Sequence, residues 1–517
     1  MKIKDLGIRL QKLYFSRSLI WVLFALGAFL RLRQYAFNRS LWLDEAALAI
    51  NFVTRSFSEL LLPLKYGEMV PVGFIMAEKL AVNFFGPSEY ALRLFPLIAG
   101  ILAMFVFYRV AAKLSDPAAV PLALGIFAIL QPLVYFSSEA KQYSFDVFIA
   151  VAILLLAVKI ADITQFKFSQ VLLYGLCGAV TVWFSHPAVF LLAGAALILV
   201  LDAYRKKRAL PAQLIPVFSL WLVSFILCYL VSKRYLSAQV HDHLKEFWKD
   251  GFMPLVPKSF QDIKWYARTF FSTFKYPGGF DQPGLAAVAF LAGVVGYRSQ
   301  RKTGSLGFLL MPIVLVLGAS AFHLYPFNNR LILFILPLLI LLIAEGAVTI
   351  KKAVERHNRF VSWSFLVLLF VTPALMSVYH VISPMSREEA RPVIRYLQNH
   401  MQPTDVLYIY NGAQKAFDYY SLVERFDPVK FPGVNSRDNA RGYLNDLRKV
   451  EGRSRVWILF SHIWKSKNMD EREFILNYLD EVGTRIEQFE VRAVGTVGLE
   501  AGDVAVYLYD LSKSFKE

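Results

Sequence analysis

Cysteine is almost absent from this sequence, and its two residues, Cys177 and Cys228, both lie inside apolar runs. This scarcity excludes a disulfide framework and a metal site of the CxxC type. The chain also lacks a GxGxxG fingerprint, a P-loop and an internal repeat. The first apolar run has no small-residue cleavage site and is long enough to cross a bilayer, so we expect a membrane span rather than a removed signal peptide.

Long apolar runs dominate the chain instead. Hydrophobic residues make up 56% of the 517 positions, and the mean hydropathy is +0.45. Both values exceed those of ordinary soluble domains. The net charge of +17 suggests nucleic-acid binding at first sight, but the basic residues cluster at the ends of the apolar runs. The positive-inside rule explains that distribution better, and we therefore expect a polytopic α-helical membrane protein with no nucleic-acid partner.

Eleven apolar runs are predicted to cross the membrane, near residues 18–37, 92–112, 118–137, 145–161, 169–185, 187–203, 212–232, 284–297, 305–322, 329–350 and 360–382. With a cytoplasmic N-terminus, this count puts basic connections such as 205–208 inside and the C-terminus outside. Counting 70–85 as a crossing would move 205–208 outside. We therefore expect residues 38–91 to form one outer loop with interfacial or re-entrant helices. Residues 233–283 are predicted to form a second long outer loop that lies on the membrane or covers a cavity.

The composition changes after about residue 384. We expect residues 1–383 to form the transmembrane domain and residues 384–517 to form a small soluble α/β domain on the outer face. The tail alternates amphipathic helix patterns with short buried-strand patterns. The helices are predicted at 387–401, 412–423, 436–450 and 470–482, and the strands at 406–410, 456–460 and 504–510.

Two adjacent carboxylates, Asp44 and Glu45, follow the first apolar run beside Trp42. A charge this close to the apolar slab is costly, so it is usually paired or functional. The alternative is a solvated loop acid next to an interfacial tryptophan. We interpret Asp44 as a candidate catalytic base, with Glu45 as a second catalytic candidate.

The same topology brings cations to the outer face. Lys141 and Arg330 stand at the outer ends of predicted helices and are the best candidates to bind a phosphate, with Arg93 as a weaker third. Plainer roles are open, because Lys141 could pair with Glu139 or Asp146, and Arg330 could simply extend to the interface. The predicted substrate contacts are Tyr66, Glu68, Glu139, Tyr143, Asp146, His323 and Tyr325.

Some of these residues have an equally simple structural interpretation. Glu68 could be an ordinary loop acid, and His186 and His323 are better explained as interfacial packing residues than as metal ligands. The convergence of the polar clusters on one face is therefore a stronger argument than any single residue.

These groups suit one kind of chemistry. A hydroxyl acceptor needs a base, and a leaving phosphate needs cations to hold its charge. Since nucleotide sugars are not available outside the bacterial cytoplasm, we expect a lipid-linked sugar donor. A lipid or polar-solute transporter (flippase) and a non-catalytic envelope assembly scaffold are the alternatives. A transporter predicts charges in the middle of helices and an internal repeat, which the sequence does not display.

Several motifs resemble the GT-C superfamily of integral-membrane glycosyltransferases. The likeness is nearest to the branch of lipid A aminoarabinose transferases and protein O-mannosyltransferases, which is glycosyltransferase family 39-like. The motifs are Trp42-Leu43-Asp44-Glu45, Tyr66-Gly67-Glu68 with Pro71, residues 86–96, residues 135–144, and Tyr325-Pro326-Phe327-Asn328-Asn329-Arg330. Two positions depart from the pattern. Lys141 stands where the branch usually has Arg, and Met69 stands where the aminoarabinose transferases have Lys.

The resemblance implies an inverting transfer of a hexosyl or pentosyl group from a polyprenyl-phosphate sugar to a hydroxyl of a lipid, glycan or protein. It implies that Asp44 is the base, that Arg330 binds the carrier phosphate, and that about seven helices form the outer-facing catalytic module. The bacterial inner membrane is the expected location, with an extracytoplasmic tail. Metal use varies in the superfamily, and the chain has no compact ligand set, so we predict neither a metal nor another cofactor. The departures leave the sugar and the acceptor open.

Overall fold

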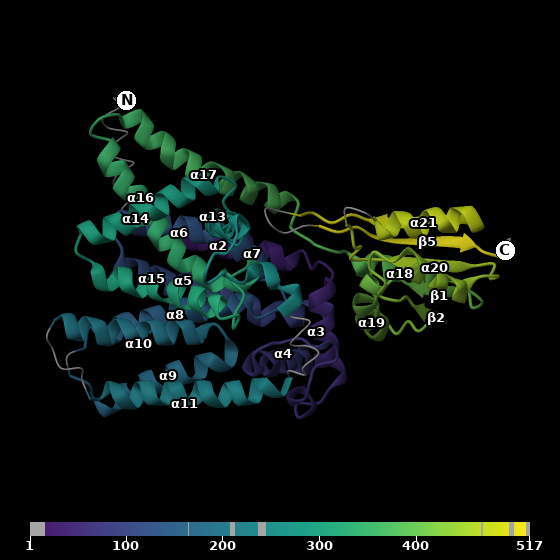
Figure 1. Cartoon of the computed structure of the whole chain (residues 1–517), viewed down its shortest axis with the longest axis horizontal. Helices are drawn as coiled ribbons and strands as arrows, with labels where there is room; N and C mark the ends of the chain where they lie inside the picture. Colours follow the sequence, from purple (N-terminus) through teal and green to yellow (C-terminus); the bar gives the residue numbers. More distant parts are fainter. Residues whose placement is uncertain are drawn as a thin grey trace.

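The structure, a computed structural model, describes residues 16–163, 165–206, 212–235, 245–466, 469–495 and 501–512. Up to residue 382 the described chain is helical, and a small sheet covered by helices follows it (Figure 1). The helical part contains α2 Arg17–Ala36, α3 Leu43–Thr54, α4 Val72–Phe85, α5 Glu89–Leu114, α6 Ala119–Ile129, α7 Gln131–Phe136, α8 Tyr143–Ala161, α9 Phe168–Phe184, α10 Ala188–Arg205, α11 Leu214–Ser232, α13 Phe260–Lys275, α14 Pro283–Ser299, α15 Thr303–Ala321, the 3-10 helix η4 Asn329–Ile335, α16 Leu336–Val354 and α17 Arg359–Ile382.

Eight helical segments of the described chain are long and apolar enough to span a membrane, by length and composition. The three apolar helices α6, α9 and α14 are shorter. Together these helices occupy all eleven predicted runs, but the number of eleven crossings is not confirmed. A straight helix needs about 20 residues to cross the hydrocarbon core. The chain is an integral membrane protein whose eight long helices account for most of the predicted spans.

The predicted span 118–137 is divided into two helices, because α6 ends at Ile129 and α7 begins at Gln131. Pro132 has no N–H to donate to the carbonyl of Ala128 four residues earlier. The guanidinium of Arg31 replaces that donor, with Nη1 3.2 Å from the carbonyl oxygen of Ala128 and Nη2 3.2 Å from that of Phe127. A cation at the C-terminus of a helix also complements the helix dipole. Arg31 thus makes the break tolerable inside an apolar environment.

The two ends of the helical part differ in character. Connections that we expected on the inside meet at one end, where Lys113 pairs with Asp162 at 2.7 Å and Lys352 with Asp116 at 2.6 Å. The loop after α2 and the loops before α8 and η4 meet at the other end, which we call the site end. The tail is attached there as well (Figure 1). The polar clusters of the predicted outer face therefore do share one end of the molecule.

The tail is a five-stranded mixed sheet with strand order β2-β1-β3-β5-β4. β1 pairs in parallel with β2 and β3, while β5 runs antiparallel to β3 and β4. Helices cover both faces, so β1 and β3 are buried throughout, as parallel strands usually are. The elements are α18 Ala390–His400, β1 Val406–Ile409, α19 Gln414–Val423, β2 Lys430–Pro432, α20 Ala440–Leu447, β3 Val456–Phe460, α21 Glu471–Val482, β4 Thr484–Val491 and β5 Val504–Asp510.

The predicted tail elements are confirmed, and two strands were not predicted. β2 has only three residues and is partly exposed, so it carries little pattern. β4 contains a register shift between Arg485 and Glu487. Such a bulge interrupts the strict alternation of apolar and polar residues by which a strand is recognised in sequence.

The tail and the first outer loop share one hydrophobic core. Phe52 of α3 and Phe74 of α4 belong to the same buried cluster as Ile394 of α18 and Phe417 of α19. As a result, α3 lies between the helical part and the tail (Figure 1). The start of α3 is therefore held from two sides.

Replacing Arg31 should test the account of the broken helix. In Arg31→Met, the carbonyls of Phe127 and Ala128 lose their donor in an apolar environment. We expect a loss of about 2 kcal/mol or more in stability, seen as a lower Tm in detergent. Arg359→Met is the matched control, because the Arg359 side chain is 81% exposed. Equal Tm values for both variants would contradict the role of Arg31.

Candidate functional site

The site is built on the first turn of α3. Trp42 is the residue before the helix, and Asp44 and Glu45 lie in its first turn. Acidic side chains are favourable there because the N–H groups of the first turn point outwards and carry partial positive charge. The Glu45 carboxylate also accepts the N–H of Trp42 at 3.4 Å. The local structure therefore explains why two acids are adjacent, but their side chains have different partners.

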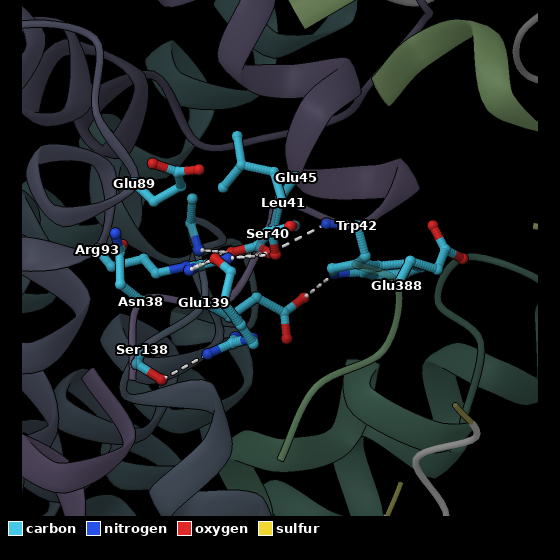
Figure 2. A network of polar contacts seen from close by, with 12 residues as sticks. Asn38, Ser40, Leu41, Trp42, Glu45, Glu89, Arg93, Ser138, Glu139 and Glu388 are labelled. Atoms are coloured by element: carbon cyan, nitrogen blue, oxygen red, sulfur yellow. Dashed lines mark hydrogen bonds and ion pairs between the residues drawn. The ribbon is translucent and has the colours of Figure 1, made fainter. Parts of the chain in front are cut away.

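Glu45 and Arg93 form what we call the closed pair. The carboxylate of Glu45 receives Arg93 Nε at 2.9 Å and Nη2 at 2.7 Å, and the N–H of Ala140 at 2.7 Å. Arg93 also donates to the carbonyls of Arg39 and Ser40 (Figure 2). The Arg93 and Glu45 side chains are 2% and 0% exposed. This bidentate pair joins α3, α5 and the loop before α8, and it holds the 39–40 backbone in place.

Asp44 and Arg330 form what we call the open pair. Arg330 Nη2 donates to Asp44 Oδ2, and Nε donates to the hydroxyl of Tyr143 at 2.8 Å. Asp44 is 17% exposed and Arg330 is 18% exposed, so neither side chain is sealed from solvent. The two residues are 286 positions apart in the chain. The sequence predicted only that they share a face, and the structure brings them into contact.

Lys141 lies beside the open pair but is bound elsewhere. Its ammonium donates to Glu68 at 2.7 Å, so the pairing with Glu139 or Asp146 considered from sequence is wrong. Burial lowers the pKa of Lys141, but the charges of Glu68 and Asp44 outweigh burial and raise it. Lys141 is therefore a cation at neutral pH. Its charge acts on Asp44 across the site.

The indole ring of Trp42 lies beside the open pair. Its indole N–H donates to Glu139 Oε1 at 3.1 Å (Figure 2). The guanidinium carbon of Arg330 lies 5.2 Å from the ring centroid, and that of Arg387 lies 3.5 Å from it. Burial and the charge of Glu45 raise the pKa of Glu139. Trp42 thus connects a buried acid to two arginines.

The cations decide the ionisation of Asp44. Burial alone would raise the pKa of Asp44, but Arg330, Lys141 and Arg387 outweigh burial and hold it below the ordinary value of 3.8. Lys415 of α19 adds to this effect. Asp44 is consequently a carboxylate at neutral pH, as a general base must be.

Two of the predicted substrate contacts, Tyr66 and Tyr325, have hydrogen-bond partners outside the open pair. Tyr66 donates to Asp418 of the tail at 2.6 Å, and burial together with this bond raises the pKa of Tyr66. Tyr325 donates to the carbonyl of Leu331 at 2.8 Å.

The two remaining predicted contacts, Asp146 and His323, lie in a buried helix turn and against an aromatic ring. Asp146 is buried in the first turn of α8. The His323 ring lies 4.8 Å from the Phe252 ring, a contact in keeping with a packing role.

Arg387 and Lys415 were missed from sequence. The sequence pattern predicts a helix that begins at Arg387, whereas α18 begins at Ala390 and Arg387 precedes it in the connection to the tail. Only the cluster of charges directly after the last predicted span could have drawn attention to it. Across the ranges described, no group of three or more His, Cys, Asp or Glu side chains is arranged to hold a metal ion. The prediction of no metal stays untested.

Comparison with known proteins identifies the fold. ArnT from Cupriavidus metallidurans superposes in its apo state with a TM-score of 0.54 at 12% identity, covering 97% of this chain and 100% of that one. The same protein bound to undecaprenyl phosphate gives a TM-score of 0.53 at 10% identity with equal coverage. The chain has a GT-C fold. The resemblance seen in the sequence motifs is thereby confirmed at the level of the fold.

Other comparisons add little. The oligosaccharyltransferase AglB from Archaeoglobus fulgidus aligns over 85% of this chain and 69% of the AglB chain, with 10% identity and a TM-score of 0.47. No family model matches the sequence, and no curated protein does. Because the identities to ArnT are so low, the likeness speaks for the GT-C fold and not for a substrate.

A third acid lies behind the closed pair. Glu78 of α4 is fully buried, and within the described structure neither of its carboxyl oxygens has a hydrogen-bond partner. Burial and the nearby charge of Glu45 raise its pKa well above 4.5. Glu78 is therefore held in its neutral form, which relieves the site of one negative charge.

The variant Glu78→Gln should reveal this neutral acid through pH. A group with a raised pKa in the folded state contributes stability below its unfolded pKa and loses it as pH rises. Wild type should thus lose stability relative to the variant above pH 4.5, by at most about 1.4 kcal/mol per pH unit. Thermal unfolding in detergent across the range from this pH to neutrality measures the difference. Glu59→Gln, at an exposed acid of the same loop, should show no such gain. A difference that is constant with pH would contradict the interpretation.

Proposed function

We propose that this protein transfers a sugar from a polyprenyl-phosphate donor to a hydroxyl acceptor, with inversion at the anomeric carbon. The open pair carries the proposal. Asp44 and Arg330 are in contact and partly exposed, whereas Glu45, the next residue, is sealed in the closed pair. A base and a phosphate-binding cation therefore stand side by side at one accessible point. The solved complex of ArnT with undecaprenyl phosphate, on the same fold, supports a lipid phosphate as the carrier.

In the proposed reaction, Asp44 accepts the proton of the acceptor hydroxyl. The acceptor oxygen forms a bond to the anomeric carbon while the bond from that carbon to the phosphate oxygen breaks. The phosphate leaves with the electron pair, and Arg330 holds the charge that develops on it. Lys141, although bound to Glu68, adds a positive field at the same place. Glu45 and Arg93 are buried in the closed pair, so we propose a positioning role for them instead of the catalytic and phosphate-binding roles expected from sequence.

The open pair also suggests how the donor prepares the base. A carboxylate bound to an arginine is a weak base, because the pair favours the charged form. A donor phosphate competes with Asp44 for the Nη2 of Arg330. Once Arg330 has turned to the phosphate, Asp44 is released and becomes more basic. Donor binding would then precede proton transfer.

We further propose that the site end faces outwards, with the tail outside and a cytoplasmic N-terminus. Basic side chains such as Lys113 and Lys352 gather at the opposite end, which the positive-inside rule assigns to the cytoplasm. The bacterial inner membrane is the location that best fits a polyprenyl carrier. The sugar, and whether the acceptor is a lipid, a glycan or a protein, are to be found by experiment.

Asp44→Asn should separate chemistry from binding. Without the base, transfer from a radiolabelled polyprenyl-phosphate sugar should fall by about 10²–10⁴-fold in a single-turnover assay in nanodiscs. The affinity for undecaprenyl phosphate should be equal to or higher than that of wild type, because a neutral amide competes less than a carboxylate for Arg330. Crude envelope extract serves as the acceptor, and the labelled product identifies it.

Two controls make this test decisive. Glu59→Gln, which changes an exposed acid of the same loop, should keep the wild-type rate. A wild-type rate in Asp44→Asn would remove Asp44 as the base. If wild type itself binds the lipid phosphate but yields no covalent product from any donor, the transporter or scaffold alternatives gain instead.

A further inference from the structure

The connection between α17 and α18 is fixed at several points to the end of α2 and to the first outer loop. The main chain of Met385 exchanges two hydrogen bonds with the side chain of Gln34, at 2.6 and 3.0 Å. Glu388 accepts the N–H of Leu43 at 3.0 Å, and Glu389 accepts both the N–H and the hydroxyl of Ser40, at 3.1 and 2.8 Å. The two glutamates thus bind the loop that leads to Asp44, on either side of Trp42.

Arg387 lies between these anchors and has a different role. Its carbonyl receives the N–H of Gly502 at 2.6 Å, so its backbone is fixed from the tail side too. Its guanidinium stacks on Trp42, with the carbon 3.5 Å from the ring centroid. The Nη1 atom is buried, and in the described part of the chain nothing accepts its hydrogens. A buried charged donor without an acceptor is costly, so this group is poised for an anion.

The position of Arg387 relative to Arg330 indicates which anion. Both guanidinium carbons are close to the same indole ring, at 3.5 and 5.2 Å from its centroid. Their separation cannot exceed the sum of these two distances, so the two guanidinium groups are neighbours around one ring. Two planar guanidinium groups are well suited to grip phosphate oxygens from two sides. Arg330 is already engaged with Asp44, whereas no carboxylate is in contact with Arg387 among the ion pairs of the described residues.

We propose that Arg387, a residue of the connection to the tail, completes the phosphate site together with Arg330. The phosphate of the lipid carrier lies between the two guanidinium groups and over the edge of Trp42. This inference rests on the proposed function and extends it, because it makes the C-terminal part of the chain a component of the donor site. Arg387 binds the carrier phosphate both before and after sugar transfer. Arg330 binds the same phosphate and, in doing so, releases Asp44.

Binding of undecaprenyl phosphate to the full-length protein in nanodiscs tests this. Arg387→Gln should weaken binding by roughly tenfold or more, through the loss of charge-assisted hydrogen bonds. Undecaprenol, which has the same chain without the phosphate, should bind to the variant as to wild type. Competition by inorganic phosphate measures how much of the binding comes from the headgroup alone, without the lipid chain. Arg437→Gln is the matched control, because Arg437 likewise stacks on a tryptophan, Trp464 of the tail, at 4.3 Å. It should bind like wild type.

The outcomes separate this inference from the proposed function. If Arg330→Gln weakens binding and Arg387→Gln does not, the role of Arg387 is refuted and the proposed function stands. If wild type does not prefer undecaprenyl phosphate over undecaprenol, the donor class itself is refuted. Equal loss of both lipids in Arg387→Gln would refute the phosphate contact, because Arg387 would then only support Trp42. Arg387→Lys, which keeps the charge without the planar fork, should restore part of the affinity if an anion is bound.

Discussion

A charge at the edge of an apolar slab must be paired, because an unpaired ion there costs several kcal/mol. This constraint governs the start of α3, where two adjacent carboxylates meet it in different ways. Glu45 is enclosed by Arg93 and neutralised permanently, and in exchange it fixes the loop before α3. Asp44 is paired with Arg330 at a point that remains partly open. The closed pair fixes the backbone at the start of α3 and thereby holds Asp44 of the open pair in position.

The tail takes part in the same arrangement. The loop before α3 and the first turn of α3 have N–H groups that no helix partner can satisfy. Glu388 and Glu389 accept those of Leu43 and Ser40, and the hydroxyl of Tyr420 accepts the N–H of Leu41 at 2.7 Å. The geometry around Asp44 therefore depends on residues such as Glu388, which lies 345 positions after the Leu43 that it binds. The tail is better described as a wall of the site than as an appended domain.

Much of the fold could be predicted from the sequence, because long apolar runs and amphipathic periods are local signals. The tertiary details could not. The break after α6 requires both a proline and the distant Arg31 that caps it. The bulge in β4 interrupts the alternation of apolar and polar residues, so this strand was not predicted. Of the site, Asp44 and Arg330 were found because each is adjacent to a predicted span, whereas the pairing of Glu45 with Arg93 depends on how α5 packs. Arg387 was concealed by a helix pattern that begins earlier than Ala390, where α18 starts.

The contrast between the pairs has a consequence for the proposed catalytic role of Asp44. A base that is always strongly paired is inactive, and a base that is never paired is too costly at this depth. In the proposed mechanism, pairing Asp44 with Arg330 resolves the conflict, because the donor phosphate replaces Asp44 as the partner of Arg330, while Lys141 and Arg387 remain to offset the added negative charge. The neutral Glu78 and the closed pair keep additional charge out of this exchange. The adjacent acids thus have separate tasks, one structural and one exchangeable, set by whether the partner arginine is enclosed by the fold or accessible to a ligand.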